Sequence, residues 1–189
     1  MGSELLVVSW DELFRDVVKL GKEIRESGFE PNLLVAVARG GWVIGRIISD
    51  VLGLKKAAGI TIAFYEEVGR AGKAPIITQP LNVDVSRLKV LVVDDIVDSG
   101  ATLKVAVNHV KEKGAGEVRS AAPYVKPWSK FEPDYYVKKV DKWVVFPYEY
   151  FETVESLKRL GEDVSVENLV KAGFDKEHLK MVDGVEGAP

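Results

Sequence analysis

The chain has 189 residues, of which 47% are hydrophobic and 29% are charged, a composition typical of a globular protein with one substantial core. Its net charge of −3 argues against a general basic surface, so we expect no nucleic-acid partner. The absence of cysteine excludes disulfides and thiolate chemistry. No stretch approaches the roughly 20 apolar residues of a membrane-spanning helix, and the first residues show no signal-peptide pattern. These features predict a cytoplasmic protein that does not associate with membranes.

Apolar residues recur in two alternating patterns along most of the chain. Ser9 and Glu12 fit a helix-capping box, and the helix that follows is expected to end at Gly28. Continuous apolar runs predict buried strands, and helical periodicity between them predicts further helices. The expected strands are 33–38, 60–65, 89–94, 118–125, 134–140 and 142–146, and the expected helices are 42–52 and 102–113. This alternation predicts an α/β fold with a mostly parallel twisted sheet flanked by helices.

Two segments depart from this alternation. Residues 66–79 are polar and contain Gly69, Gly72 and Pro75, which predicts a long mobile loop, with room for a small hairpin, that acts as a lid. From residue 152 the pattern changes to short polar helices at 152–160, 165–172 and 175–181. We therefore expect a main domain of residues 1–151 and a helical C-terminal extension of residues 152–189.

A group of carboxylates follows the strand predicted at 89–94. Asp94 and Asp95 end this strand, and Asp98 comes directly before a turn of small residues, Ser-Gly-Ala-Thr at 99–102. In an open parallel sheet, ligands bind beyond the carboxyl ends of the strands. Two adjacent carboxylates accept hydrogen bonds from the vicinal hydroxyls of a sugar, or they hold a divalent cation. The strand end therefore predicts a site for a diol or a metal ion.

The small-residue turn leads directly into the next predicted helix. Backbone N–H groups at such a helix N-terminus, together with the helix dipole, favour an anion. Ser99 and Thr102 add hydroxyl donors, and Gly100 permits close approach because it has no Cβ. Taken singly, Asp98 fits a helix cap and the two preceding acids fit a solvated strand end. Their combination favours a monophosphate cradle beside the diol site, which a ribose 5-phosphate would fill.

Two other strand ends carry residues that suit phosphate and base recognition. Arg39 and Gly40 follow the strand at 33–38, and Arg39 can make bidentate contacts to phosphate oxygens. Glycines after a strand are more often a simple turn. Lys126 follows the strand at 118–125 and would ordinarily be a surface cation, whereas Trp143 would ordinarily be core packing.

Residues 92–102 closely resemble the phosphoribosyl-pyrophosphate (PRPP) signature of the type I phosphoribosyltransferases, namely a hydrophobic strand, two acids, two apolar residues, an acid and a small-residue turn ending in Thr. The resemblance extends over residues 9–149 and is closest to the purine branch, the hypoxanthine and xanthine-guanine enzymes. It implies a core with a small hood, Mg²⁺ as cofactor, and a homodimer or homotetramer. The implied reaction transfers a 5-phosphoribosyl group from PRPP to N9 of a 6-oxopurine, giving a purine nucleoside monophosphate and pyrophosphate.

The resemblance also implies which residues hold PRPP and carry out the proton transfer. Asp98 is expected near purine N7 as the catalytic acid or base. The expected PRPP-binding residues are Arg39, Gly40, Asp94, Asp95, Asp98, Ser99, Gly100, Ala101 and Thr102. A cis peptide is expected between Ala38 and Arg39, and Arg70 or Lys73 would reach the pyrophosphate from the loop.

The remaining implied roles concern the purine and the metal ion. Lys126 would donate to purine O6, Trp143 would stack on the base, and the backbone of Val144 would hydrogen-bond the base edge. Asp95 and Glu149 are the expected metal ligands, and Glu149 stands where the family commonly has Asp.

Two alternative functions stay open. One is a phosphoribosyltransferase for adenine, a pyrimidine or another small acceptor, against which Lys126 and Trp143 argue. The other is a PRPP-sensing regulator that binds nucleic acid, against which the acidic net charge argues.

Overall fold

The computed structural model describes residues 5–66 and 73–185. The chain forms two compact units: residues 15–140, here called the core unit, and residues 1–14 with 141–189, here called the terminal unit. This grouping differs from the division expected at residue 151, because residues 141–151 pack with the helices that follow them. Within the described ranges, no helix combines the length and apolar character needed to cross a bilayer.

The core unit is built on a seven-stranded sheet whose main path has the strand order β4-β3-β2-β5-β7-β6, with β8 paired to β7. Every described pairing between the strands of this sheet is parallel except that of β3 with β4, which confirms the predicted mostly parallel sheet. The strands are β2 (Leu33–Ala38), β3 (Ala57–Glu66), β4 (Lys73–Gln79), β5 (Lys89–Val93), β6 (Ile96–Val97), β7 (Glu117–Val125) and β8 (Tyr135–Lys139).

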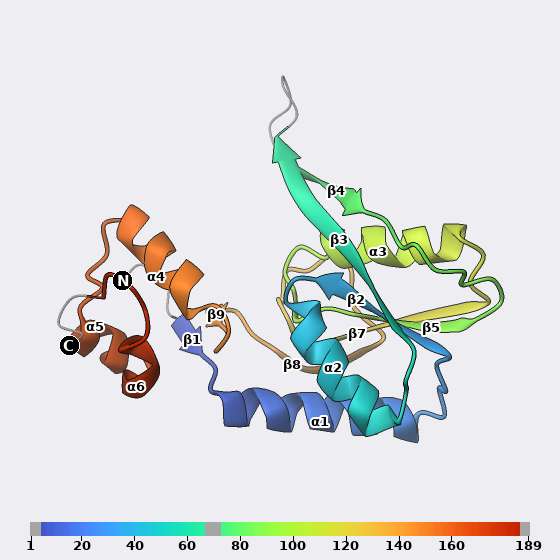
Figure 1. The fold of residues 1–189 in the computed structure, drawn as a ribbon, viewed down its shortest axis with the longest axis horizontal. Coiled ribbons are helices and arrows are strands. Elements are labelled where there is room, and N and C mark those ends of the chain that lie inside the picture. The colour runs from blue at the N-terminus through green and yellow to red at the C-terminus, as the bar shows by residue number, and fades with distance from the viewer. Residues whose placement is uncertain (1–4, 67–72, 186–189) are drawn as a thin grey trace. The chain divides into compact units, whose positions relative to one another are not determined.

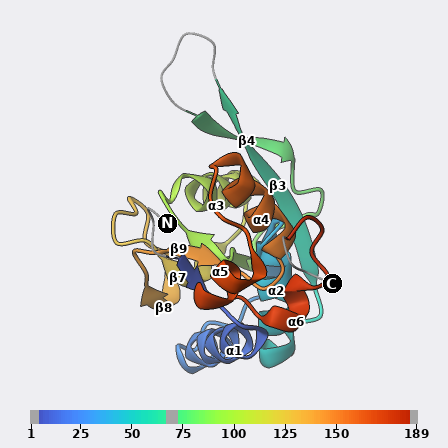
Figure 2. The same ribbon diagram turned by 90° about the vertical axis from the view of Figure 1, so that its left-hand side faces the viewer.

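Helices cover both faces of this sheet because successive strand residues point to opposite sides. On one face, Val35 and Val92 pack in a buried cluster with Leu103 of α3. On the other face, Gly45 of α2 lies so close to Leu34 and Val93 that an added Cβ would sit 2.9 and 3.3 Å from their side chains. Figures 1 and 2 show α1 and α2 on one side of the sheet and α3 on the other. These helices are α1 (Trp10–Glu26), α2 (Gly41–Leu52) and α3 (Ala101–Glu112).

Strand β4 shows that the segment predicted as a loop with room for a small hairpin, residues 66–79, contains a strand that forms a hairpin with β3. Residues 73–79 pair antiparallel with β3, with Ile77 opposite Ile62 and Pro75 opposite Phe64 (Figure 1). Pro75 is tolerated because β4 is the edge strand of the sheet, and the β-branched residues after it favour a strand. Arg70 and the side chain of Lys73 lie outside the described residues, so the predicted lid and its pyrophosphate contact stay predictions.

The terminal unit joins a two-stranded parallel sheet to three helices. Strand β1 (Leu5–Val7), which the sequence analysis missed, pairs with β9 (Trp143–Val145). Helices α4 (Tyr150–Arg159), α5 (Val166–Lys171) and α6 (Lys176–Leu179) confirm the three helices predicted after residue 151. Val145 of β9 is fully buried in one cluster with residues of all three helices. The C-terminal extension therefore shares a hydrophobic core with β9.

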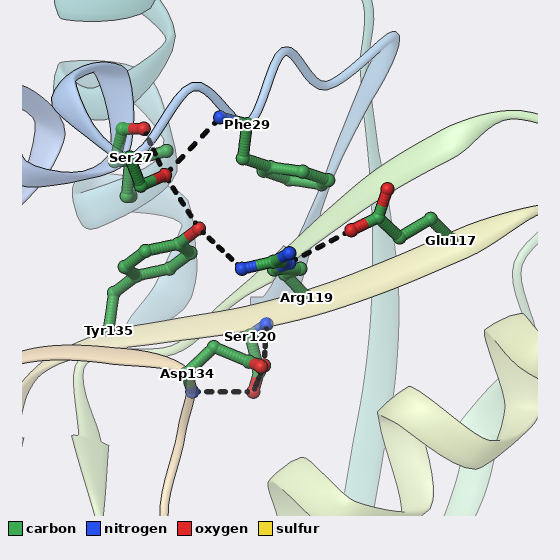
Figure 3. Close-up of polar contacts among 8 residues, drawn as sticks. Ser27, Phe29, Glu117, Arg119, Ser120, Asp134 and Tyr135 are labelled. Carbon is green, nitrogen blue, oxygen red and sulfur yellow. Dashed lines mark hydrogen bonds and ion pairs between the residues drawn. The ribbon is translucent and has the colours of Figure 1, made fainter.

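A polar network ties α1 to the beginning of β7 (Figure 3). The hydroxyl groups of Ser27 and Tyr135 lie 2.8 Å apart, and Arg119 donates to the Tyr135 hydroxyl at 3.1 Å and to Glu117 at 2.9 Å. Arg119 and Glu117 stand near the amino end of β7, whereas Lys126 follows its carboxyl end. We therefore assign the network to the support of the sheet and not to the ligand site.

Candidate active site

The predicted site residues of the core unit lie at the carboxyl ends of the sheet strands. Strands β2, β5, β6 and β7 run parallel, so their carboxyl ends point the same way. Ala36 is level with Val93, and Val97 is level with Val125. The fold thus brings together segments that are far apart in sequence. The segments that follow these strand ends directly are residues 39–40, 94–95, 98–102 and 126.

The turn after β2 touches the acidic pair after β5. A Cβ added to Gly40 would lie 1.6 Å from Oδ2 of Asp95, and one added to Gly41 would lie 2.6 Å from the carbonyl oxygen of Val93. Only glycine permits this approach. The peptide bond between Ala38 and Arg39 is cis, as the resemblance implied. The predicted pyrophosphate turn and the predicted sugar-binding acids therefore belong to one site.

The two acids are held by backbone hydrogen bonds. The Asp95 N–H donates to Oδ1 of Asp94 at 3.0 Å, and the Ile96 N–H donates to Oδ1 of Asp95 at 2.8 Å. Both acids are only 8% exposed. Burial, and then the charge of Asp95, raise the pKa of Asp94 well above its usual value. A ligand that brings hydroxyl donors or positive charge would relieve this repulsion.

The turn after β6 has the geometry of an anion cradle. Gly100 has a φ of 83°, and its carbonyl accepts the Lys104 N–H at 3.0 Å as α3 begins. A Cβ at Gly100 would lie 2.5 Å from the Cβ of Phe131, so Gly100 is required by its φ and by its packing. The Ser99 hydroxyl accepts the Ala101 N–H at 3.3 Å, and Thr102 is half-buried in the first turn of the helix.

A cavity of about 560 Å³ opens beside this turn. It has two cationic groups on its walls, which suits the charge of a phosphate. Its lining residues are Ser99, Gly100, Ala101, Lys104, Trp128, Lys130 and Phe131. The sequence analysis missed Lys104 and Lys130. Lys104 is close enough to the turn in sequence to have been found, whereas the approach of Lys130 depends on the fold.

Lys126 and Asp98, the residues expected to recognise the purine, lie near each other. The Lys126 N–H donates to the carbonyl of Val97 at 2.8 Å, which places Lys126 beside the residue that precedes Asp98. The indole Nε1–H of Trp128 donates to Oδ1 of Asp98 at 2.9 Å. The Nζ atom of Lys126 lies 5.3 Å from the centre of the Trp128 ring. Trp128 therefore contacts both residues, although no sequence motif gave it a role.

The other expected purine and metal contacts belong to the terminal unit. Trp143 is 44% exposed on β9, and Val144 is buried. An exposed indole on a short strand is suited to stack on a planar base. Glu149 directly precedes α4 and its carbonyl accepts the Thr153 N–H at 2.8 Å. The roles of Trp143, Val144 and Glu149 stay predictions.

The acidic pair suits a Mg²⁺ ion that takes most of its coordination from water and from the bound substrate. Within the described ranges, no three side chains of the metal-binding types form a group that could hold a metal ion. Mg²⁺ usually keeps several waters and binds through one or two carboxylates plus substrate phosphates. Asp94 and Asp95 supply two carboxylates that lie next to each other, and Asp95 is the one predicted as a metal ligand. The acids, the glycine turn and the small-residue turn thus lie together at the carboxyl ends of the strands, an arrangement that suits a sugar phosphate.

Comparison with known proteins gives the family. The phosphoribosyl transferase domain family matches residues 8–153. The xanthine-guanine phosphoribosyltransferase of Desulfotalea psychrophila (strain LSv54 / DSM 12343) is 30% identical over 144 residues, which cover 75% of this chain and 84% of that protein. The crystal structure of a purine phosphoribosyltransferase from Pyrococcus horikoshii Ot3 is 36% identical, with a TM-score of 0.71, over 78% of this chain and 95% of that one. The chain belongs to the phosphoribosyltransferase family and, within it, to the purine branch.

Proposed function

We propose that the protein transfers a 5-phosphoribosyl group from PRPP to N9 of a 6-oxopurine, that is guanine, hypoxanthine or xanthine. The products are a purine nucleoside monophosphate and pyrophosphate. The observation that supports the proposal is the close approach of Gly40 to Asp95, because it brings the expected pyrophosphate turn next to the expected sugar-binding acids. The printed names of the relatives, which are xanthine-guanine and purine phosphoribosyltransferases, support the same reaction.

Each part of PRPP has a matching group in the core unit. Asp94 and Asp95 accept hydrogen bonds from the ribose hydroxyls, since an ionised carboxylate is a strong acceptor for such donors. The backbone N–H groups of residues 98–102 hold the 5-phosphate at the N-terminus of α3. Arg39 and Gly40 bind the pyrophosphate, which carries growing negative charge as it leaves.

The transfer breaks the bond from C1 of the ribose to a pyrophosphate oxygen and forms the bond from C1 to purine N9. The electron pair of the breaking bond stays on pyrophosphate, and C1 passes through an oxocarbenium-like state, as in other glycosyl transfers. Asp98 takes the proton that the base gives up through N7, and Lys126 donates a hydrogen bond to O6. Stacking on Trp143 fixes the plane of the base.

The proposed cofactor is Mg²⁺, with Asp95 and Glu149 as its expected protein ligands. When bound, the ion would neutralise negative charge on the pyrophosphate. We also propose a cytoplasmic location and a homodimer or homotetramer, which the family resemblance supports. Light scattering coupled to gel filtration measures the oligomeric state, and a monomer at assay concentration would refute that part.

The deciding experiment measures pyrophosphate release from PRPP with Mg²⁺ and a panel of guanine, hypoxanthine, xanthine, adenine and uracil. We expect release only with 6-oxopurines, each giving the matching nucleoside monophosphate on chromatography. Release with adenine or uracil alone would assign the protein to another nucleobase. No release with any base, together with salt-sensitive RNA or DNA binding, would favour the regulator.

A further inference from the structure

Trp128 is an exposed aromatic residue with two specific polar neighbours. Its side chain is 56% exposed, although burial of an indole is normally favourable. Its indole N–H donates to Oδ1 of Asp98, and its ring lies 5.3 Å from the ammonium group of Lys126. It is therefore in contact with both residues that the proposed function assigns to the purine.

We propose that Trp128 is a positioning residue for purine transfer, which fixes the carboxylate of Asp98 through its indole N–H and holds the ammonium of Lys126 against its ring. The inference rests on the proposed function. It adds a specific role for a residue that lies outside the PRPP signature at 92–102.

The carboxylate of Asp98 needs such support. Asp98 is exposed, and its side chain stands in the bend between β6 and the turn before α3. An exposed carboxylate rotates freely unless a fixed donor holds one of its oxygens. Because the indole takes Oδ1, the second oxygen is left in a defined direction to meet the purine. Catalytic groups must be oriented in this way, since small misplacements of a proton acceptor cost rate.

The segment that carries Trp128 is itself anchored to the phosphate turn. The Lys130 N–H donates to the carbonyl of Ser99 at 3.1 Å, and the Ser129 N–H donates to the carbonyl of Lys126 at 3.0 Å. Phe131 packs against Gly100, where an added Cβ would lie 2.5 Å from it. The indole is therefore presented to Asp98 from a fixed backbone.

The contact with Lys126 gives a reason for an aromatic ring at position 128 instead of a smaller hydrogen-bond donor. Lys126 is only 7% exposed as a residue, and the negative face of the indole stabilises the ammonium group beside it. The same ring that donates to Asp98 through its edge thus supports Lys126 through its face. One side chain sets the relative position of the proton acceptor and the O6 donor.

Two substitutions separate these two contacts. Trp128→Phe keeps an aromatic face and removes the N–H, so we expect kcat to fall about tenfold with KM for PRPP unchanged. A tenfold fall corresponds to the low end of the free energy of a hydrogen bond to a charged group, which we expect because the contact is partly exposed. Trp128→Leu also removes the aromatic face, so KM for the 6-oxopurine should rise as well. Trp42→Phe is the matched control, since Trp42 is 54% exposed on α2 and should leave both constants within about twofold.

The double variant tests whether Trp128 acts through Asp98. In an Asp98→Asn background, Trp128→Phe should cause no further fall in kcat, because the group that it orients is already inactive. An equal tenfold fall in both backgrounds, or unchanged kcat in Trp128→Phe, overturns the proposal. Melting temperatures of all variants exclude loss of folding as the cause.

A measurement without substrate keeps this inference separate from the proposed function. The Trp128 indole N–H signal in ¹H–¹⁵N spectra is identified by its loss in Trp128→Phe. It should shift and exchange faster with solvent in Asp98→Ala, which removes the acceptor. An unmoved signal overturns the contact even if the enzyme is active, whereas a shifted signal in a protein inactive on every purine refutes the proposed function alone.

Discussion

Gly40 offers the sharpest test of the site, because substitution by alanine adds a single methyl group beside Asp95. In Gly40→Ala the new Cβ would lie 1.6 Å from Oδ2 of Asp95, and real Cβ contacts are essentially never closer than 3.0 Å. The carboxylate of Asp95 must therefore move by at least 1.4 Å, which is 3.0 minus 1.6. Because the added Cβ would also lie 2.3 Å from Cγ of Asp95, the whole carboxylate must shift, and this weakens the 2.8 Å hydrogen bond from the Ile96 N–H to Oδ1.

A displacement of this size should cost far more activity than stability. A misplacement of about 1 Å at a site can cost about 100-fold in rate, or about 2.7 kcal/mol of transition-state stabilisation. The φ of Gly40 is −59°, which suits alanine, so the substitution adds no backbone strain of its own. We therefore expect kcat/KM to fall about 100-fold while the melting temperature changes by only a few degrees.

Steady-state kinetics, PRPP binding by calorimetry and thermal melting measure these effects. Gly21→Ala is the matched control, because its Cβ would lie 2.8 Å from Val51 in the contact between α1 and α2. It should lower the melting temperature and leave KM for PRPP unchanged. Normal PRPP affinity and kcat/KM in Gly40→Ala would refute the argument that Gly40 and Asp95 form one site.

Four further substitutions test individual residues. In Asp94→Asn the melting temperature at neutral pH should rise by about 2–4 °C per kcal/mol of relieved repulsion, and PRPP binding should be lost. The reason is that the pKa of Asp94 is raised in the folded protein, so the stability of the wild type falls as the pH increases from the ordinary pKa of 3.8 to the raised one. An unchanged pH dependence of melting in the variant would contradict this. Asp98→Asn should lower kcat by about 10²–10⁴-fold with PRPP binding largely kept, and full activity would remove its proton-transfer role. Lys126→Ala should impair 6-oxopurines selectively, so an equal loss with adenine would show that Lys126 does not contact O6. Leu169→Ala removes a side chain from the core that contains Val145 of β9, and should lower the free energy of unfolding by about 2–5 kcal/mol. Because β9 also carries Trp143, we expect KM for the purine to rise, and a higher KM for PRPP alone would contradict that link.

Local features of the fold were predictable because they depend on neighbouring residues. The strand at 33–38 was predicted with its observed bounds, and Ser9 accepts the Glu12 N–H as a capping residue should. Strand β1 was missed, and β4 was predicted only as room for a small hairpin within a loop. Strand β1 has three residues and depends on its pairing with β9, and β4 contains Pro75, whose position at a sheet edge is a property of the whole sheet.

The acidic pair and the turn at 98–102 could be read from the sequence because they lie within nine consecutive positions that also form a strand end and a helix start. Their chemistry is local, and so a kind of ligand could be proposed from it. What the sequence left open is which distant groups complete the site. The contact of Gly40 with Asp95, and that of Trp128 with Asp98 over 30 residues, depend on parallel strands that bring remote turns to one edge. Only the tertiary structure sets these distances, since they follow from the order and register of the strands and not from any single segment.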